Sequence, residues 1–259
     1  MDIRLINFTG STFTGRKIQA AAASSILKKV VLELGGKSPA LIFEDANIEK
    51  AAGETVFSLQ ILMGQACIAN SRIYVQETVA DKFKAAFKAN FEAANKGDPL
   101  MPETQQGPQA DAIQYERIKA YLNAAKEGKG KLELGGEVTQ VDGKGFFVEP
   151  TVYSDVPEDE KTQKEEVFGP FVNINTFKTE AEAIEKANDT EYGLYASVYT
   201  NDLSRAMRVA KAFESGTVGV NCTSPTNAMD MPFGGYKGSG QAGKAWDTVS
   251  RSISRSRPF

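Results

Sequence analysis

The sequence predicts an α/β fold with a mostly parallel, twisted sheet flanked by helices. Short runs rich in β-branched and aromatic residues alternate with helical stretches along the chain, as expected for strands joined by crossover helices. At 259 residues, the chain can bury one large core, or one domain and part of another. Hydrophobic residues make up 41% of it and charged residues 24%, which is typical of a soluble globular protein.

In the first half of the chain, turns separate the expected elements. Asp45 is expected to cap a helix that runs towards Gly64. Further along, four apolar side chains repeat every fourth residue, as on the sheet-facing side of a helix: Val79, Phe83, Phe87 and Phe91. We interpret this stripe as core. The strands are expected at 5–8, 29–34, 40–43 and 73–76, and the helices at 16–24 (rich in alanine), 45–64 and 79–91.

The second half of the chain continues in the same style. A loop at 98–109 leads into an amphipathic helix, in which four side chains are expected to face the core: Ile113, Ile118, Tyr121 and Leu122. No repeat or low-complexity tract interrupts the order, so we expect one compact body. The remaining strands are expected at 146–152, 172–177, 195–199 and 217–221, and the helices at 180–188 and 202–214.

Charge and cysteine content narrow the class of protein. The net charge of −3 gives no field that favours nucleic acid or an anionic membrane. No apolar run approaches the roughly 18 residues that cross a bilayer, and the N-terminus lacks the features of a signal peptide. Only Cys67 and Cys222 are present, which argues against a disulfide framework. We therefore expect a reducing, cytoplasmic location.

The chain contains no histidine. This excludes Ser-His and Cys-His catalytic pairs and histidine-ligated metals, and we predict no metal site. A general base must therefore be a carboxylate, a lysine or a tyrosine.

Cys67 is a candidate nucleophile. It follows Gly64, Gln65 and Ala66 at the end of an apolar helical run, and the glycine allows the backbone to turn sharply there. If a helix began just after the cysteine, its free N–H groups would favour the thiolate and could hold an oxyanion. The alternative is a structural cysteine whose thiol stays protonated at neutral pH.

Glu33 is a candidate general base. It lies in an apolar strand between Leu32 and Leu34, just before a Gly-Gly turn. A carboxylate in that setting either lines a cleft or is paired in the interior, and partial burial would raise its pKa towards the range useful for a base. The alternative is an exposed carboxylate at the end of a strand.

Several motifs, taken together and in this order, resemble the aldehyde dehydrogenase family over essentially the whole chain. They are Phe8–Gly15, Leu32–Pro39, Gly64–Cys67, Lys164–Pro170 and Pro232–Gly240. The resemblance implies the family's catalytic (thiol) domain at 35–240, preceded by a remnant of its Rossmann-like cofactor domain at 1–34. It also implies a tail at 241–259 that is a possible oligomerisation strand.

The resemblance also implies roles for individual residues. Cys67 matches the nucleophile that attacks an aldehyde to give a thiohemiacetal, which is oxidised by NAD or NADP to a thioester. Glu33 matches the base that activates water to hydrolyse this thioester. The cofactor-binding positions of the family fall on Gly10, Ser11 and Gly15, near the pyrophosphate, and on Glu166 and Phe168, near the nicotinamide ribose and ring.

Departures from the family leave three functions open. Most of the family's cofactor domain precedes the segment that matches Phe8, so we expect most of that domain to be missing here, and Leu62 replaces a common asparagine. The first function is NAD(P)-dependent oxidation of an aldehyde to a carboxylic acid. The second is cofactor-independent carbonyl chemistry in a truncated relative: ester or thioester hydrolysis, condensation or isomerisation. The third is a non-catalytic binding or oligomerisation module.

The expected partners follow from these functions. We expect a small aldehyde or acyl substrate. We also expect a homo-oligomer or a partner chain, because the helix at 16–24 would otherwise leave a face uncovered.

Overall fold

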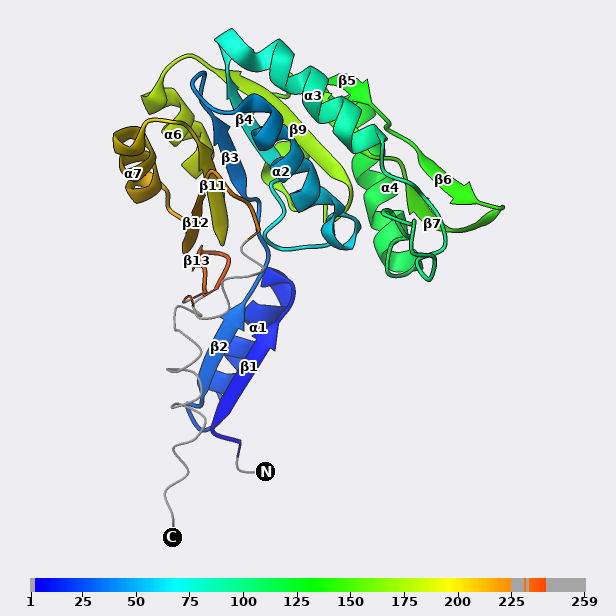
Figure 1. Cartoon of the computed structure of the whole chain (residues 1–259). Coiled ribbons are helices and arrows are strands. Elements are labelled where there is room, and N and C mark those ends of the chain that lie inside the picture. Colours follow the sequence, from blue (N-terminus) through cyan, green and yellow to red (C-terminus); the bar gives the residue numbers. More distant parts are fainter. Residues whose placement is uncertain (1–2, 225–230, 232, 241–259) are drawn as a thin grey trace.

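The fold is built around a seven-stranded sheet, shown in Figure 1. The structure is a computed structural model that describes residues 3–224, 231 and 233–240, so the possible oligomerisation strand at 241–259 lies outside the described residues. All strand pairs in this sheet are parallel except β5 with β8, which confirms the predicted fold class. In spatial order the strands are β12 (Thr217–Val220), β11 (Tyr195–Tyr199), β3 (Pro39–Ile42), β4 (Arg72–Gln76), β9 (Phe171–Phe177), β8 (Thr151–Ser154) and β5 (Lys131–Leu134).

Helices cover both faces of the sheet because the side chains of each strand alternate between the faces. On one face, Ala40 and Ile42 of β3 pack against α2 (Ile48–Gln60) and α3 (Ala80–Glu92). On the other face, Leu41 between them packs against α6 (Glu180–Asn188) and α7 (Leu203–Ala212). The predicted phenylalanine stripe is confirmed as core: Phe83, Phe87 and Phe91 are at most 1% exposed.

A smaller unit at the N-terminus projects away from this body (Figure 1). In it, β1 (Leu5–Thr9) and β2 (Lys29–Glu33) form a two-stranded parallel sheet, joined by α1 (Thr12–Ala23). Within α1 only Gly15 and Ala22 are buried, while Phe13 is 67% exposed. Among the residues that the structure describes, this helix therefore has an uncovered face, as expected from the sequence. The separation of the sheets favours a domain boundary near residue 34, which stays a prediction.

A buried serine ties the end of β2 to the larger body. Ser239 accepts a backbone hydrogen bond from Leu34 (2.9 Å), and its hydroxyl donates to the carbonyl of Gly35 (2.6 Å). The same hydroxyl accepts from the N–H of Gly193 (3.0 Å) in β10 (Tyr192–Gly193), which pairs with β13 (Tyr236–Lys237). The chain just after β2 is thereby fixed against the segments that precede β11 and end at Gly240.

The prediction of one strand at 146–152 is wrong. The structure has β7 (Lys144–Val148) and then β8, with Pro150 between them, because proline has no N–H to donate to a sheet. β7 pairs instead with β6 (Val138–Val141) in a separate hairpin. Neither β5 nor β6 was predicted, since each has only four residues, of which two are polar.

Two other expectations fail for local reasons. Asp45 does not cap α2; Asn47 does, by accepting from the N–H of Lys50 (3.1 Å), while Asp45 pairs with Arg205 of α7. Ile113 is 75% exposed rather than inward-facing. It precedes Ile118 by five residues in α4 (Ala112–Glu127), and at 100° per residue this places it about 140° away from the buried face.

Candidate active site

Cys67 lies in a turn between α2 and β4. The helix ends at Gln60, and a 3-10 turn, η1 (Ile61–Gly64), follows, with Gly64 at φ +73°. A Cβ on Gly64 would lie 2.1 Å from the carbonyl oxygen of Gly169, so only glycine fits there. The N–H of Ala69 closes the turn on the carbonyl of Ala66 (3.0 Å). A strand rather than a helix follows the half-buried cysteine.

The Gly35–Gly36 pair contacts both the backbone of Cys67 and the carboxylate of Glu166. A Cβ on Gly36 would lie 2.0 Å from the carbonyl oxygen of Cys67. The N–H of Gly36 donates to Oε1 of Glu166 (2.9 Å), and a Cβ on Gly35 would lie 2.5 Å from Oε2 of the same residue. These contacts require two glycines and bring two of the sequence-predicted residues, Cys67 and Glu166, to one place.

Glu33 ends β2 immediately before this glycine pair. Its carbonyl accepts from the N–H of Gly10 (3.0 Å), and its backbone bridges to Gly240. Burial raises the pKa of Glu33 to about 7. The charge of Glu33 in turn raises the pKa of Cys67, so the thiol and this carboxylate lie within electrostatic reach of each other. The structure therefore has a partly buried carboxylate near the thiol, while the role of Glu33 as a base stays a prediction.

The thiol itself is not activated in the resting site. Burial raises the pKa of Cys67 to about 11, and the charges of Glu166 and Glu33 act in the same direction. The backbone N–H groups of Cys67 and Ile68 oppose them by stabilising the thiolate. At neutral pH the thiol is therefore protonated and needs a base. Glu33 and Glu166, each with a pKa raised by burial to about 7, are suited to that task.

The positions predicted to bind a cofactor lie in two places. Ser11 caps α1 by accepting from the N–H of Thr14 (3.3 Å), and the first turn of the helix holds no acidic residue. An exposed helix N-terminus of this kind fits an anionic group such as a pyrophosphate. Gly10 uses its own N–H on Glu33, and Gly15 is buried where a Cβ would lie 2.7 Å from Leu34.

Phe168 and Glu166 form the second place. Phe168 has a left-handed backbone, with φ +58°, and its carbonyl accepts from the amide of Gln114 (2.8 Å). Glu166 keeps one oxygen on Gly36, and a Cβ on Gly35 would crowd the other oxygen. Because residue 35 is a glycine, no Cβ fills the space beside Oε2 of Glu166. A carboxylate oxygen there could accept from a ribose hydroxyl, so the residues present fit a dinucleotide in part.

Sequence reasoning missed Lys37. It follows Gly36 directly and is 1% exposed, and its amine has no hydrogen-bond partner among the described residues. Burial, together with the charge of Arg72, lowers the pKa of Lys37 to about 7. A lysine between Gly-Gly and Ser-Pro is typical of an exposed turn, so the local sequence gave no signal of its burial.

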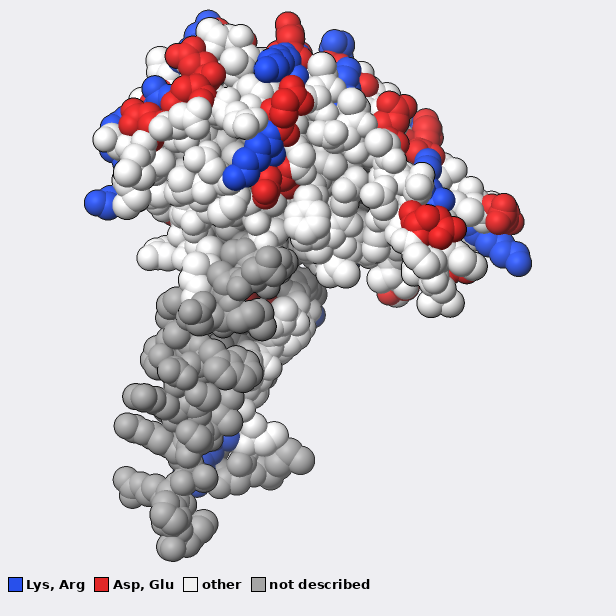
Figure 2. Space-filling model, in the orientation of Figure 1, with Lys and Arg blue, Asp and Glu red and all other residues white. Residues whose placement is uncertain are grey.

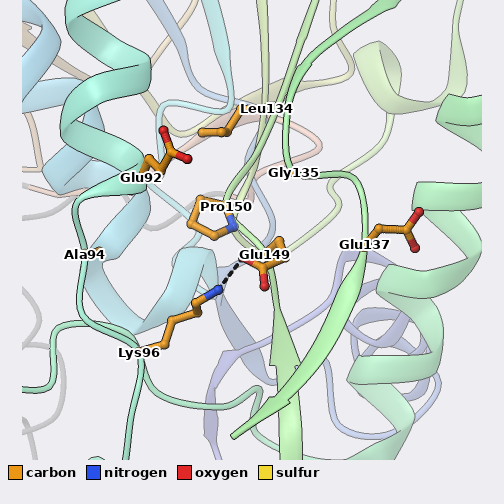
Figure 3. Close-up of a pocket in the computed structure, with 8 residues that line it drawn as sticks. All are labelled: Glu92, Ala94, Lys96, Leu134, Gly135, Glu137, Glu149 and Pro150. Carbon is orange, nitrogen blue, oxygen red and sulfur yellow. Dashed lines mark hydrogen bonds and ion pairs between the residues drawn. The ribbon is translucent and has the colours of Figure 1, made fainter.

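Other surface features lie apart from this site. A pocket of about 300 Å³ opens between the end of α3 and β5, and an ion pair between Lys96 and Glu149 lies on one side of it (Figure 3). Its lining shares no residue with the Cys67 neighbourhood: Glu92, Ala94, Lys96, Leu134, Gly135, Glu137, Glu149 and Pro150.

Charges of both signs intermingle over the larger body on the face shown in Figure 2. Among the described residues, no helix has both the length and the apolar character needed to cross a membrane. In the same part of the chain, no three or more metal-ligating side chains are grouped.

Comparisons with known proteins show the family of this chain. The model of the aldehyde dehydrogenase family matches residues 1–257. An aldehyde dehydrogenase of Davidiella tassiana is 48% identical over 240 residues, which are 93% of this chain and 48% of the relative. The chain belongs to the aldehyde dehydrogenase family, and it spans about half the length of the curated relatives it matches.

Solved structures show the same similarity. The P. syringae indole-3-acetaldehyde dehydrogenase AldA, in complex with NAD+ and IAA, superposes with a TM-score of 0.93 at 35% identity, covering 97% of this chain and 51% of that one. A betaine aldehyde dehydrogenase variant from Staphylococcus aureus, in complex with NAD+ and with a BME-modified cysteine, gives a TM-score of 0.88 at 36% identity. That match covers 92% of this chain and 49% of that one.

Proposed function

We propose that this chain provides the thiol active site for NAD(P)-dependent oxidation of an aldehyde to a carboxylic acid. The observation that supports this most directly is the contact of both Glu166 and Cys67 with Gly35–Gly36, with Glu33 at the end of the adjoining strand. A nucleophile and a nearby carboxylate with a pKa near neutrality are groups that such a reaction requires.

The steps assigned to the chain's own residues follow from this geometry. Glu33 or Glu166 accepts the proton of the Cys67 thiol, and the thiolate then attacks the aldehyde carbon to give a thiohemiacetal. The N–H groups of Cys67 and Ile68 already favour negative charge at the sulfur and would stabilise charge that develops beside it. NAD or NADP, when bound, supplies the two-electron acceptor that converts this adduct into a thioester. Glu33 then takes a proton from the water that hydrolyses the thioester.

The cofactor contacts are part of the same proposal. The N-terminus of α1 with Gly10, Ser11 and Gly15 would hold the pyrophosphate, while Glu166 and Phe168 would hold the ribose and the nicotinamide ring. The NAD+ complexes of the structural neighbours support this assignment. The modified cysteine of the S. aureus enzyme supports a reactive thiol in the family.

A second candidate function uses the same thiol without a cofactor. With Cys67 as nucleophile and Glu33 as base for water, the site could hydrolyse an activated ester or thioester. This is favoured by the pKa of Glu33, which burial raises into the range of a base active at neutral pH.

The assembly and location remain part of the proposal. We infer that a homo-oligomer or a partner chain covers the exposed face of α1, where Phe13 is 67% exposed. Both Cys67 and Cys222 are free thiols, which suits a reducing, cytoplasmic location.

The test compares the parent chain with Cys67→Ala and with Cys222→Ala, a control at the exposed cysteine. NAD+ and NADP+ are titrated by calorimetry, and reduced cofactor is followed by fluorescence with a short aliphatic aldehyde. Saturable binding, with turnover lost only in Cys67→Ala, supports the dehydrogenase. Cofactor-independent p-nitrophenyl ester hydrolysis, lost in the same variant, supports the second function. Activities that survive in Cys67→Ala refute both.

A further inference from the structure

A second charged group is buried beside the candidate site, and neither proposed function uses it. The amine of Lys37 has no hydrogen-bond partner among the described residues, although the side chain is 1% exposed. A buried, unpaired ammonium is costly, so this amine is neutral or is stabilised by a nearby negative charge. The local charges decide between these states.

Three charged side chains act on the amine of Lys37: Arg72, Glu166 and Glu165. Arg72 of β4 donates from Nε to the carbonyl of Lys37 (3.0 Å), and its fixed positive charge disfavours a protonated amine. Glu166 and Glu165, just beyond α5 (Lys161–Lys164), favour protonation. Arg72 also donates to the carbonyls of Lys186 and Ala187, and its guanidinium stays charged at every relevant pH. Of the two carboxylates, Glu166 has the larger effect on the pKa of Lys37, and unlike Arg72 it can lose its charge near neutral pH.

The dependence is mutual. The charge of Lys37 lowers the pKa of Glu166, against the burial that raises it to about 7, and so does Arg117 of α4. Glu166 in turn raises the pKa of Cys67, of Tyr192 and, less strongly, of Tyr121. Lys37, Gly36 and Gly35 are consecutive, and both glycines contact Glu166 while Gly36 also contacts Cys67. Lys37 therefore directly follows the short segment of backbone that contacts both the carboxylate of Glu166 and the main chain of Cys67.

We propose that Lys37 is a positioning residue for the Cys67 site, whose buried amine controls whether Glu166 is ionised against Gly36 and, through it, how readily the thiol ionises. This rests on the proposed function only in taking Cys67 as the nucleophile. When the amine and the carboxyl share one proton, the pair is neutral overall; when that proton leaves, the remaining negative charge opposes the thiolate.

The first measurement follows Glu166 directly. In [13C]glutamate-labelled protein, the carboxyl resonance that disappears in Glu166→Gln is titrated with pH. We expect a midpoint near neutrality in the parent chain and a midpoint at least about one pH unit higher in Lys37→Met, because an opposite charge has been removed. Lys29→Met, at an exposed lysine of β2, is the matched control and leaves the midpoint unchanged. A parent midpoint near 4.5 refutes the proposal without any variant.

The second measurement follows the thiol in a Cys222→Ala background. Iodoacetamide alkylation of Cys67 is timed by mass spectrometry between pH 6 and pH 9. At pH 8, Lys37→Met and Glu166→Gln each alkylate faster than the parent, by up to about tenfold for one pKa unit. In the Glu166→Gln background, Lys37→Met then has no further effect.

If Lys37 only supported the local structure, Lys37→Met would still change the alkylation rate of Cys67 in the Glu166→Gln background. That result overturns the proposal. Neither measurement requires turnover, so both stand whether or not the chain oxidises aldehydes. Should Lys37→Met fail to fold, Lys37→Gln takes its place, and the parent midpoint still decides.

Discussion

Gly36→Ala tests the close packing of the glycine pair against Cys67. The added Cβ would lie 2.0 Å from the carbonyl oxygen of Cys67, whereas real Cβ contacts are essentially never below 3.0 Å. The two backbones must therefore separate by about 3.0 − 2.0 = 1.0 Å. No rotation of a side chain relieves this contact, because the opposing atom belongs to the main chain.

The size of the effect can be worked out by comparison with a second glycine. Overpacking of this kind costs about 1–3 kcal/mol, offset by about 0.4–1 kcal/mol from the stiffer unfolded chain. We expect Gly36→Ala to lower the free energy of unfolding by about 1–2 kcal/mol. Gly53, inside α2, has nothing within 4 Å of an added Cβ, so Gly53→Ala should raise it by about 0.5–1 kcal/mol.

Urea unfolding followed by far-UV circular dichroism measures both variants. At a slope of about 3 kcal/mol/M, the Gly36→Ala midpoint falls by about 0.3–0.7 M, while the Gly53→Ala midpoint rises. Alkylation of Cys67 should also change in Gly36→Ala alone. A Gly36→Ala chain as stable as the parent, with unchanged alkylation, would refute the packing argument.

Three further predictions concern charge and backbone. The raised pKa of Glu33 stabilises the folded chain below pH 4.5, its ordinary pKa, and this stability is lost as the pH rises through about 7. In urea unfolding, the free energy of unfolding of Glu33→Gln should therefore rise relative to that of the parent between pH 5 and pH 8. A difference that stays constant over this range would contradict this. Asp45→Ala removes the partner of Thr200 and Arg205 and should cost about 2–3 kcal/mol, seen as a melting point about 4–8 °C lower. Leu62→Asn relieves a leucine at φ +51° and should gain about 0.5 kcal/mol, whereas a loss would mean that the leucine packs usefully.

Periodic parts of the fold could be predicted from the sequence, and parts decided by partners could not. The spacing of Phe83, Phe87 and Phe91 alone predicts one buried helix face, whatever that face packs against. The break at Pro150 separates two strands of different sheets, and a run of apolar residues cannot show that. Asp45 is a good cap by type, but Thr200 and Arg205, far along the chain, use its carboxylate first.

The site shows the same division. The short motifs pointed to Cys67 and Glu33, and the structure couples them electrostatically. The pKa of Lys37 depends on its burial and on the charges of Arg72 and Glu166, which are distant from it in sequence and approach it only in the folded chain. A turn sequence such as Gly-Gly-Lys-Ser-Pro contains no trace of those neighbours.

The strand order has a consequence for how the chain acquires its native state during synthesis. β3, at residues 39–42, lies beside β11, at residues 195–199, and the end of β2 is held by Ser239. Contacts so distant in sequence form late and slowly, because long loops must close first. On the ribosome, the thiol and its carboxylates would emerge well before the segment that fixes them, so the nascent chain exposes the edge of β3 to other proteins until residues 195–199 arrive.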